Sequence, residues 1–190
     1  MPASLCVSLL TMGGSSLLLQ VLLLRELLTS FFGNELAVST VLASWLLLVA
    51  AGSALGSRSG RSPTAGVRTF GLLQVLLAVV VPLAVLGSRF VGGRTFFPGE
   101  VVSPPIMLGL SALTVAPGCL LLGAQFAAGC RAALELGLGS RSSSTVYALE
   151  ALGALTAGLL FHFLLADHYG PVSLGLVLGA LNALSAVGLL

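Results

Sequence analysis

Six long apolar segments are the feature that most constrains the fold of this chain. A helix needs about 20 mostly apolar residues to cross the ~30 Å hydrocarbon core of a bilayer. The segments are Ser4–Phe32, Leu36–Ser57, Thr69–Gly87, Ile106–Arg131, Thr145–Ala166 and Pro171–Leu190. We therefore expect one all-α domain over residues 1–190, a polytopic membrane bundle of about six transmembrane helices.

The charge content indicates a lipid environment. Of the residues, 57% are hydrophobic and only 7% are charged, whereas a soluble domain carries roughly 25% charged residues. The basic residues are all arginine, and this composition is typical of a GC-rich bacterial genome. The sequence contains no basic stretch with interleaved aromatic residues, so it gives no indication of a nucleic-acid partner. The lipid bilayer is the first partner that the sequence predicts.

The arginines divide unequally between the two sets of loops. One set holds two of them, Arg89 and Arg94, both within the loop Ser88–Pro105. The other set holds Arg58, Arg61, Arg68, Arg131 and Arg141. Positively charged loops stay in the cytoplasm, so we expect a bacterial inner-membrane protein with both termini cytoplasmic.

Small residues recur at a spacing of four in two segments. Such spacing lets helix backbones approach closely in lipid, where apolar contact alone gives little association. The residues are Gly52, Gly56 and Gly60 in the second segment, and Gly175, Gly179 and Ala183 in the sixth. We expect tight packing there, although glycine and alanine are abundant throughout this chain.

A faint internal repeat links the two halves. Gln20 and Gln125 are 105 positions apart, and so are the similar runs that begin at Thr40 and Thr145. A three-helix unit followed by its copy sits inverted in the membrane, which is a recurring plan of transporter halves. The sequence is thus compatible with a 3+3 inverted repeat, although so biased a composition also produces such matches by coincidence.

Charged groups inside a membrane helix are costly, so each requires a reason. The first segment carries Gln20, Arg25 and Glu26. Gln20 shares a helix face with Gly13 and Ser16 rather than with the two charges. The structural interpretation is a polar cluster of these side chains with the outer turn Asn34-Glu35 or with Asp167. The functional interpretation is a ligand or proton site.

The fifth segment carries the other candidate ligand residues, Tyr147, Glu150 and His162. Glu150 is favoured by the helix dipole in a first turn, or it serves as a proton or cation site. His162 and His168 are too poorly placed on one helix to ligate haem together. We therefore expect neither cofactor nor metal. Phosphate-binding loops and catalytic side-chain sets are missing, so we expect no enzyme activity.

Several short motifs then carry a family resemblance. The sequence resembles the membrane part of fused spermidine synthase-like membrane proteins in the run from Leu17 to Leu28, the turn Phe32-Gly33-Asn34-Glu35, and the patterns Gly52-x-x-x-Gly56 and Tyr147-x-x-Glu150-x-x-Gly153. That family places multi-pass helices before a cytoplasmic Rossmann-type aminopropyltransferase domain. Its membrane part is similar to half of a major-facilitator transporter. The sequence stops at Leu190 within the sixth segment, so the resemblance implies a membrane module and carries over no catalytic residue.

Three functions remain open on these grounds. The first is a non-enzymatic membrane subunit that anchors or scaffolds a larger assembly, such as a redox or electron-transfer complex, beside other membrane subunits. The second is a half-transporter that works as a homodimer, with Gln20, Gln74, Gln125 and Asn182 around a polar midplane cavity. The third is a quinone- or lipid-binding subunit, with Glu150 and Tyr147, or Arg25 and His162, as hydrogen-bonding groups.

Overall fold

The computed structural model describes residues 2–33, 35–59, 66–95 and 102–189, and these ranges contain helices and no strand. Their side chains are described except at 59 and 91–95. The helices are α1 (Ala3–Ser30), α2 (Glu35–Ser59), α3 (Gly66–Thr95), α4 (Pro104–Glu135), α5 (Ser142–Leu160) and α6 (Pro171–Val187). A short 3-10 turn, η1 (Gly139–Arg141), precedes α5, and a π-helical turn, η2 (Phe161–Leu165), follows it.

The helix lengths confirm an all-α architecture suited to a membrane. Five spans are long and apolar enough to cross a bilayer, the fifth of them running from Gly139 to Leu165. The sixth helix, α6, has 17 residues, or about 26 Å at the helical rise of 1.5 Å per residue. That length lies at the lower limit for a spanning helix. The described residues therefore hold five or six helices able to span a membrane.

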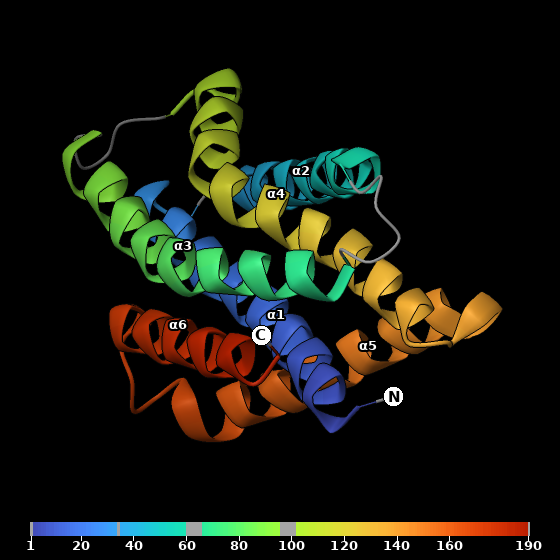
Figure 1. Cartoon of the computed structure of the whole chain (residues 1–190). Coiled ribbons are helices and arrows are strands. Elements are labelled where there is room, and N and C mark those ends of the chain that lie inside the picture. Colours follow the sequence, from blue (N-terminus) through green and yellow to red (C-terminus); the bar gives the residue numbers. More distant parts are fainter. Residues whose placement is uncertain (1, 34, 60–65, 96–101, 190) are drawn as a thin grey trace.

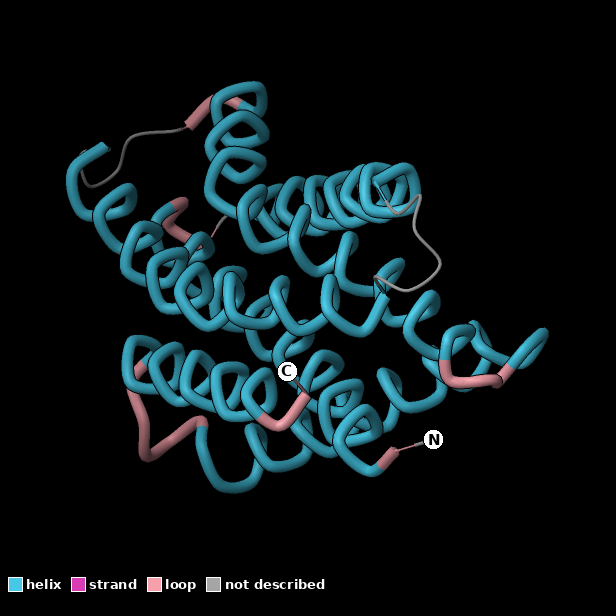
Figure 2. Tube along the Cα trace, in the orientation of Figure 1, coloured by secondary structure: helices cyan, strands magenta, loops and turns pink. Residues whose placement is uncertain are grey.

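Helix α1 is the centre of the bundle. It contacts every other α-helix, and 56% of its most apolar window is buried. Figure 1 shows α2 and α4 on one side of α1, α5 and α6 on the other, and α3 across the front. Figure 2 shows that helices make up nearly the whole trace, with short connections between them. The outer helices expose large apolar side chains such as Leu113 and Leu184, as expected of a surface that faces lipid.

One end of the bundle is held by polar contacts between three helices. The Arg131 Nη1 group donates a hydrogen bond of 2.8 Å to the Gly56 carbonyl oxygen. The Glu135 carboxylate accepts hydrogen bonds from the backbone nitrogens of Gly66 (2.5 Å) and Val67 (3.2 Å). Free backbone N–H groups in the first turn of a helix need such acceptors. Glu135 therefore caps α3, which begins at Gly66, earlier than the predicted Thr69.

Two helices differ from their predicted form. The third was expected to end at Gly87 but continues to Thr95, and the first proline after Gly87 comes only at Pro98. The fifth was expected to be regular to Ala166 but changes to π-helix at Phe161. Figure 1 shows α4 bending along its course, and Pro117 lies inside it, where proline removes a backbone hydrogen bond. The predicted features at Asn34, Gly60 and Arg61 lie outside the described residues.

Candidate functional site

The candidate site lies where α1 crosses α5. Glycine allows the two backbones to touch, because a methyl group on Gly13 would collide with the backbone of Glu150. A methyl group on Gly153 would likewise collide with the backbone of Leu10. Small residues at helix crossings permit such close approach in membranes. The crossing fixes the level of Glu150 on α5 against Gly13 on α1.

A cavity of about 220 Å³ opens beside this crossing. We call it the α1–α5 polar pocket. One wall is a single face of α1 and the other a single face of α5, since the spacings of three, four and seven residues repeat on both. Its lining residues are Gly13, Ser16, Leu17, Gln20, Tyr147, Glu150, Ala151 and Ala154. The structure thus places Gln20 beside Tyr147 and Glu150, three of the six predicted site residues.

These three side chains supply the hydrogen-bonding groups of the pocket. Gln20 offers a donor and an acceptor, Tyr147 a hydroxyl and Glu150 a carboxyl group. No hydrogen bond or ion pair joins any of them to another described residue. Tyr147 is 66% exposed, whereas Gln20 and Glu150 are half-buried. Polar groups left unbonded next to hydrocarbon cost free energy, so the pocket has capacity to bind a polar group from outside the chain.

Arg25 and Glu26 lie at the opposite end of α1. The Glu26 carboxylate forms an ion pair of 3.3 Å with Arg89 Nε on α3, a partner that differs from the predicted ones, the turn Asn34-Glu35 and Asp167. That prediction missed the partner because Arg89 was assigned to a loop, and α3 in fact continues past it. Arg25 is exposed and forms no ion pair within the described part of the chain.

His162 lies exposed in the π-helical turn that follows α5. Its ring packs edge-on against Phe163, with 4.8 Å between the ring centroids. No ion pair or hydrogen bond connects His162 with Arg25 among the described residues. The inner pair of predicted quinone-binding groups, Tyr147 and Glu150, shares one pocket with Gln20, whereas the outer pair, Arg25 and His162, stays a prediction.

The other intramembrane amides do not join Gln20. Asn182 on α6 donates a hydrogen bond of 2.7 Å to the Ser15 hydroxyl on α1. Ser15 and Gln20 are five residues apart, which separates their directions by about 140° around the helix. Gln74 and Gln125 are fully buried and have no hydrogen-bond partner among the described residues. The four amides predicted to surround one transport cavity thus face at least two different parts of the bundle.

Sequence reasoning missed the polar contacts that α1 makes with α6. Ser185 Oγ donates a hydrogen bond of 2.8 Å to Ser8 Oγ. Ser185 lies about one turn along α6 from Asn182, which donates to Ser15. The signal was present, because Ser8 and Ser15 are seven residues apart and therefore share a face of α1. Serine is common in this chain, which hid the signal.

Comparison of the chain with protein-family models, with curated proteins and with solved structures finds no match.

Proposed function

We propose that the chain is a non-enzymatic integral membrane subunit that binds a transmembrane helix of another subunit at the α1–α5 polar pocket. The observation that carries the proposal is the group of three unbonded polar side chains, Gln20, Tyr147 and Glu150, in one pocket. A carboxyl group beside hydrocarbon is expensive and requires a partner. A partner helix with a hydrogen-bond donor at this level would provide it.

The exposure of α5 supports the same proposal. In the span Gly139–Leu165, which contains α5, only 6% of the most apolar window is buried, against 56% for α1. Helix α5 therefore lies at the periphery of the bundle, where a neighbouring subunit has direct access to Glu150. The predicted association with a redox or electron-transfer complex, and the resemblance to spermidine synthase-like membrane proteins, stay predictions from the sequence. So does the bacterial inner membrane as the location.

A site-specific photo-crosslinking experiment tests the proposal. A benzophenone amino acid replaces Ala151, which lines the pocket, in the full chain expressed in its native membrane. We expect one discrete protein adduct, which Glu150→Gln weakens at least several-fold because an amide replaces the carboxyl group. The matched control replaces Leu113, which is 73% exposed on α4, and should give only lipid adducts. Lipid adducts alone at Ala151, or an adduct insensitive to Glu150→Gln, would exclude the proposed partner site.

The second candidate is a quinone-binding subunit, favoured by the same pocket. A quinone head requires one or two hydrogen-bonding groups within an apolar cleft. Gln20, Tyr147 and Glu150 supply such groups, and the remaining lining residues are small or apolar except Ser16. Quinone that co-purifies with the wild-type chain and is lost in both Gln20→Leu and Glu150→Gln would favour this function over helix binding.

A half-transporter with a 3+3 repeat remains the third candidate. Its support is the pattern of close helix contacts: α1 packs on α5 and α2 packs on α4, and α3 packs on α6. Suppose that α1, α2 and α3 correspond to α4, α5 and α6. The α1–α5 contact then corresponds to the α2–α4 contact, and the α3–α6 contact corresponds to itself. Solute uptake by proteoliposomes that contain the chain alone would favour this candidate.

A further inference from the structure

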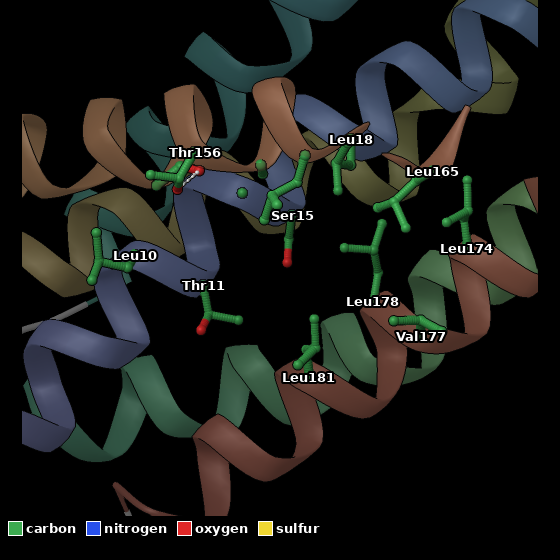
Figure 3. Close-up of a pocket in the computed structure, with 14 residues that line it drawn as sticks. Leu10, Thr11, Ser15, Leu18, Thr156, Leu165, Leu174, Val177, Leu178 and Leu181 are labelled. Carbon is green, nitrogen blue, oxygen red and sulfur yellow. Dashed lines mark hydrogen bonds between the residues drawn. The ribbon is translucent and has the colours of Figure 1, made fainter. Parts of the chain in front are cut away.

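A second pocket lies on the other side of the α1–α5 crossing, between α1, α5 and α6 (Figure 3). We call it the α6 groove. Its volume is about 280 Å³. Aliphatic side chains form most of its wall, among them Leu18 of α1, Leu165 of η2, and Leu174, Val177 and Leu181 of α6. Figure 3 shows these side chains arranged around an open space rather than interlocked across it.

The polar atoms in the wall of the α6 groove are already bonded within the chain. The hydroxyls of Thr11 and Thr156 each donate to the backbone carbonyl one turn earlier, at 2.9 and 3.0 Å. The Ser15 hydroxyl accepts a hydrogen bond of 2.7 Å from Asn182. A water molecule needs two to four polar partners to occupy a cavity, and this wall has no such set to offer. The part of a ligand that lies in the groove must therefore be apolar.

Arg25, a cation without an ion-pair partner among the described residues, lies on the line of the groove. Thr11, Leu18 and Arg25 are spaced seven residues apart, so they share one face of α1. Arg25 lies about 10 Å beyond Leu18 along the helix axis. The groove runs toward the same end, where Leu165 and Leu174 flank the turn between η2 and α6. The neighbouring carboxylate, Glu26, pairs with Arg89. No described carboxylate forms an ion pair with Arg25.

We infer that the α6 groove binds one acyl chain of an anionic phospholipid whose phosphate group contacts Arg25. The apolar wall and the unpaired cation at its end are complementary to the two parts of this molecule. A transmembrane helix from a partner would satisfy the apolar wall but leaves the arginine without a counter-charge. The proposal is independent of the α1–α5 polar pocket, because Gln20 and Arg25 point about 140° apart on α1.

The headgroup charge supplies the selectivity. Every phospholipid presents apolar chains, so transfer of a chain from the bilayer into the groove brings little hydrophobic gain. One arginine near the membrane surface favours an anionic over a neutral lipid by about fivefold. Asp167 in the turn before α6 is exposed and would compete for Arg25, so Asp167→Asn should preserve or increase the preference.

Tryptophan quenching by brominated lipids tests the inference. The only tryptophan, Trp45, is changed by Trp45→Phe, and Val177→Trp places a reporter in the groove of the full chain. Vesicles of phosphatidylcholine contain equal fractions of either phosphatidylglycerol or phosphatidylcholine with dibrominated acyl chains. We expect the phosphatidylglycerol to quench this reporter with about fivefold higher relative affinity. Arg25→Gln should abolish the preference, and Arg25→Lys should retain most of it.

A second groove provides the matched control. It lies between α3 and α4, has a volume of about 380 Å³ and includes Leu113 and Thr114 in its wall. Leu113→Trp reports on it in the same Trp45→Phe background, and both lipids should quench that reporter equally. Equal quenching by both lipids at the Val177→Trp reporter would overturn the inference. A preference that survives Arg25→Gln, or that is as large at the Leu113→Trp reporter, would also overturn it.

Discussion

At the scale of residues, two glutamines place unbonded polar groups in the interior of the bundle. Gln74 on α3 and Gln125 on α4 are fully buried, and none of their amide atoms has a hydrogen-bond partner among the described residues. Gly129 packs against Phe70, and one turn further along these antiparallel helices Gln125 lies at the level of Gln74. Two amides at one level without a bond are a source of instability, because unsatisfied buried polar groups cost ~1–3 kcal/mol each.

We predict that Gln125→Leu stabilises the bundle by about 1–3 kcal/mol, because it removes two unsatisfied atoms. Gln74→Leu should give a similar gain, and the two gains should add. Thermal unfolding in mild detergent measures each variant. If the single substitutions instead destabilise and the double-mutant cycle shows coupling, the two amides bond to each other and the prediction is wrong.

The candidate site was partly predictable at this scale. The spacing of Tyr147 and Glu150 placed them on one face of α5, and that of Gly13, Ser16 and Gln20 placed these on one face of α1. Periodicity within a helix cannot show which faces of two helices meet. That depended on the fit of Gly13 against the Glu150 backbone, so the joining of the two sets into one pocket was not predictable from the sequence.

At the scale of elements, glycine controls how closely the helices pack. Helix α4 meets α2 through Gly123, where a methyl group would clash with the Val49 carbonyl and lie 2.6 Å from the Ser53 nitrogen. Gly52 of α2 is in similar contact with Leu120. The predicted importance of Gly52 and Gly56 for packing agrees with this geometry. In contrast, a methyl group added to Gly109, which lies on α4 like Gly123, would have no atom within 4 Å.

We predict opposite effects for the same substitution at these two positions of α4. Gly123→Ala should destabilise the bundle by about 1–3 kcal/mol, since the backbones must separate. Gly109→Ala should stabilise it by ~0.5–1 kcal/mol, because alanine restricts the unfolded chain. Thermal unfolding of both variants under identical conditions measures the difference. Equal shifts would show that the contact between α2 and α4 tolerates a methyl group.

A second prediction concerns the start of α3. Glu135→Ala removes the acceptor of the Gly66 and Val67 amides and should destabilise the bundle by about 1–3 kcal/mol. Glu135→Gln retains one acceptor oxygen and should lose less. Hydrogen exchange at Gly66 and Val67 should accelerate in the alanine variant. Unchanged exchange would mean that other groups cap this helix.

Helix boundaries were predictable to within a few residues only where the sequence contains a clear signal. The start of α6 at Pro171 was predicted correctly, because proline is favoured in the first helical turn. The start of α3 depends instead on Glu135, which is far away in the chain. The π-helical turn at Phe161 has no signature in hydropathy, so it could not be predicted.

At the scale of the whole molecule, the charged residues separate toward the two ends. Arg131 and Glu135 join the end of α2, the start of α3 and the end of α4. Arg58, Arg68 and Arg141 lie at or next to helix termini of this same end. The ion pair of Glu26 with Arg89 lies at the other end. The arrangement agrees with the predicted grouping of the loops into two sets.

We predict that the end with more arginines is cytoplasmic. Ser140→Cys in η1 and His168→Cys in the turn before α6 mark the two ends, and both positions are exposed. Cys6, Cys119 and Cys130 are first replaced by alanine. A membrane-impermeant maleimide should label His168→Cys in intact cells, and Ser140→Cys only after permeabilisation. The reverse pattern would invert the orientation, and labelling of both in intact cells would contradict their placement on opposite sides.

The central position of α1 has a consequence for biosynthesis. Its hydroxyls at Ser8 and Ser15 are bonded to α6, across sequence separations of 177 and 167 residues. The ribosome produces α1 first and α6 much later. During this interval α1 lies in the membrane with the face that carries Ser8 and Ser15 not yet covered by α6. The bundle therefore closes in a late step, and any delay before α6 inserts exposes the nascent chain to membrane chaperones and proteases.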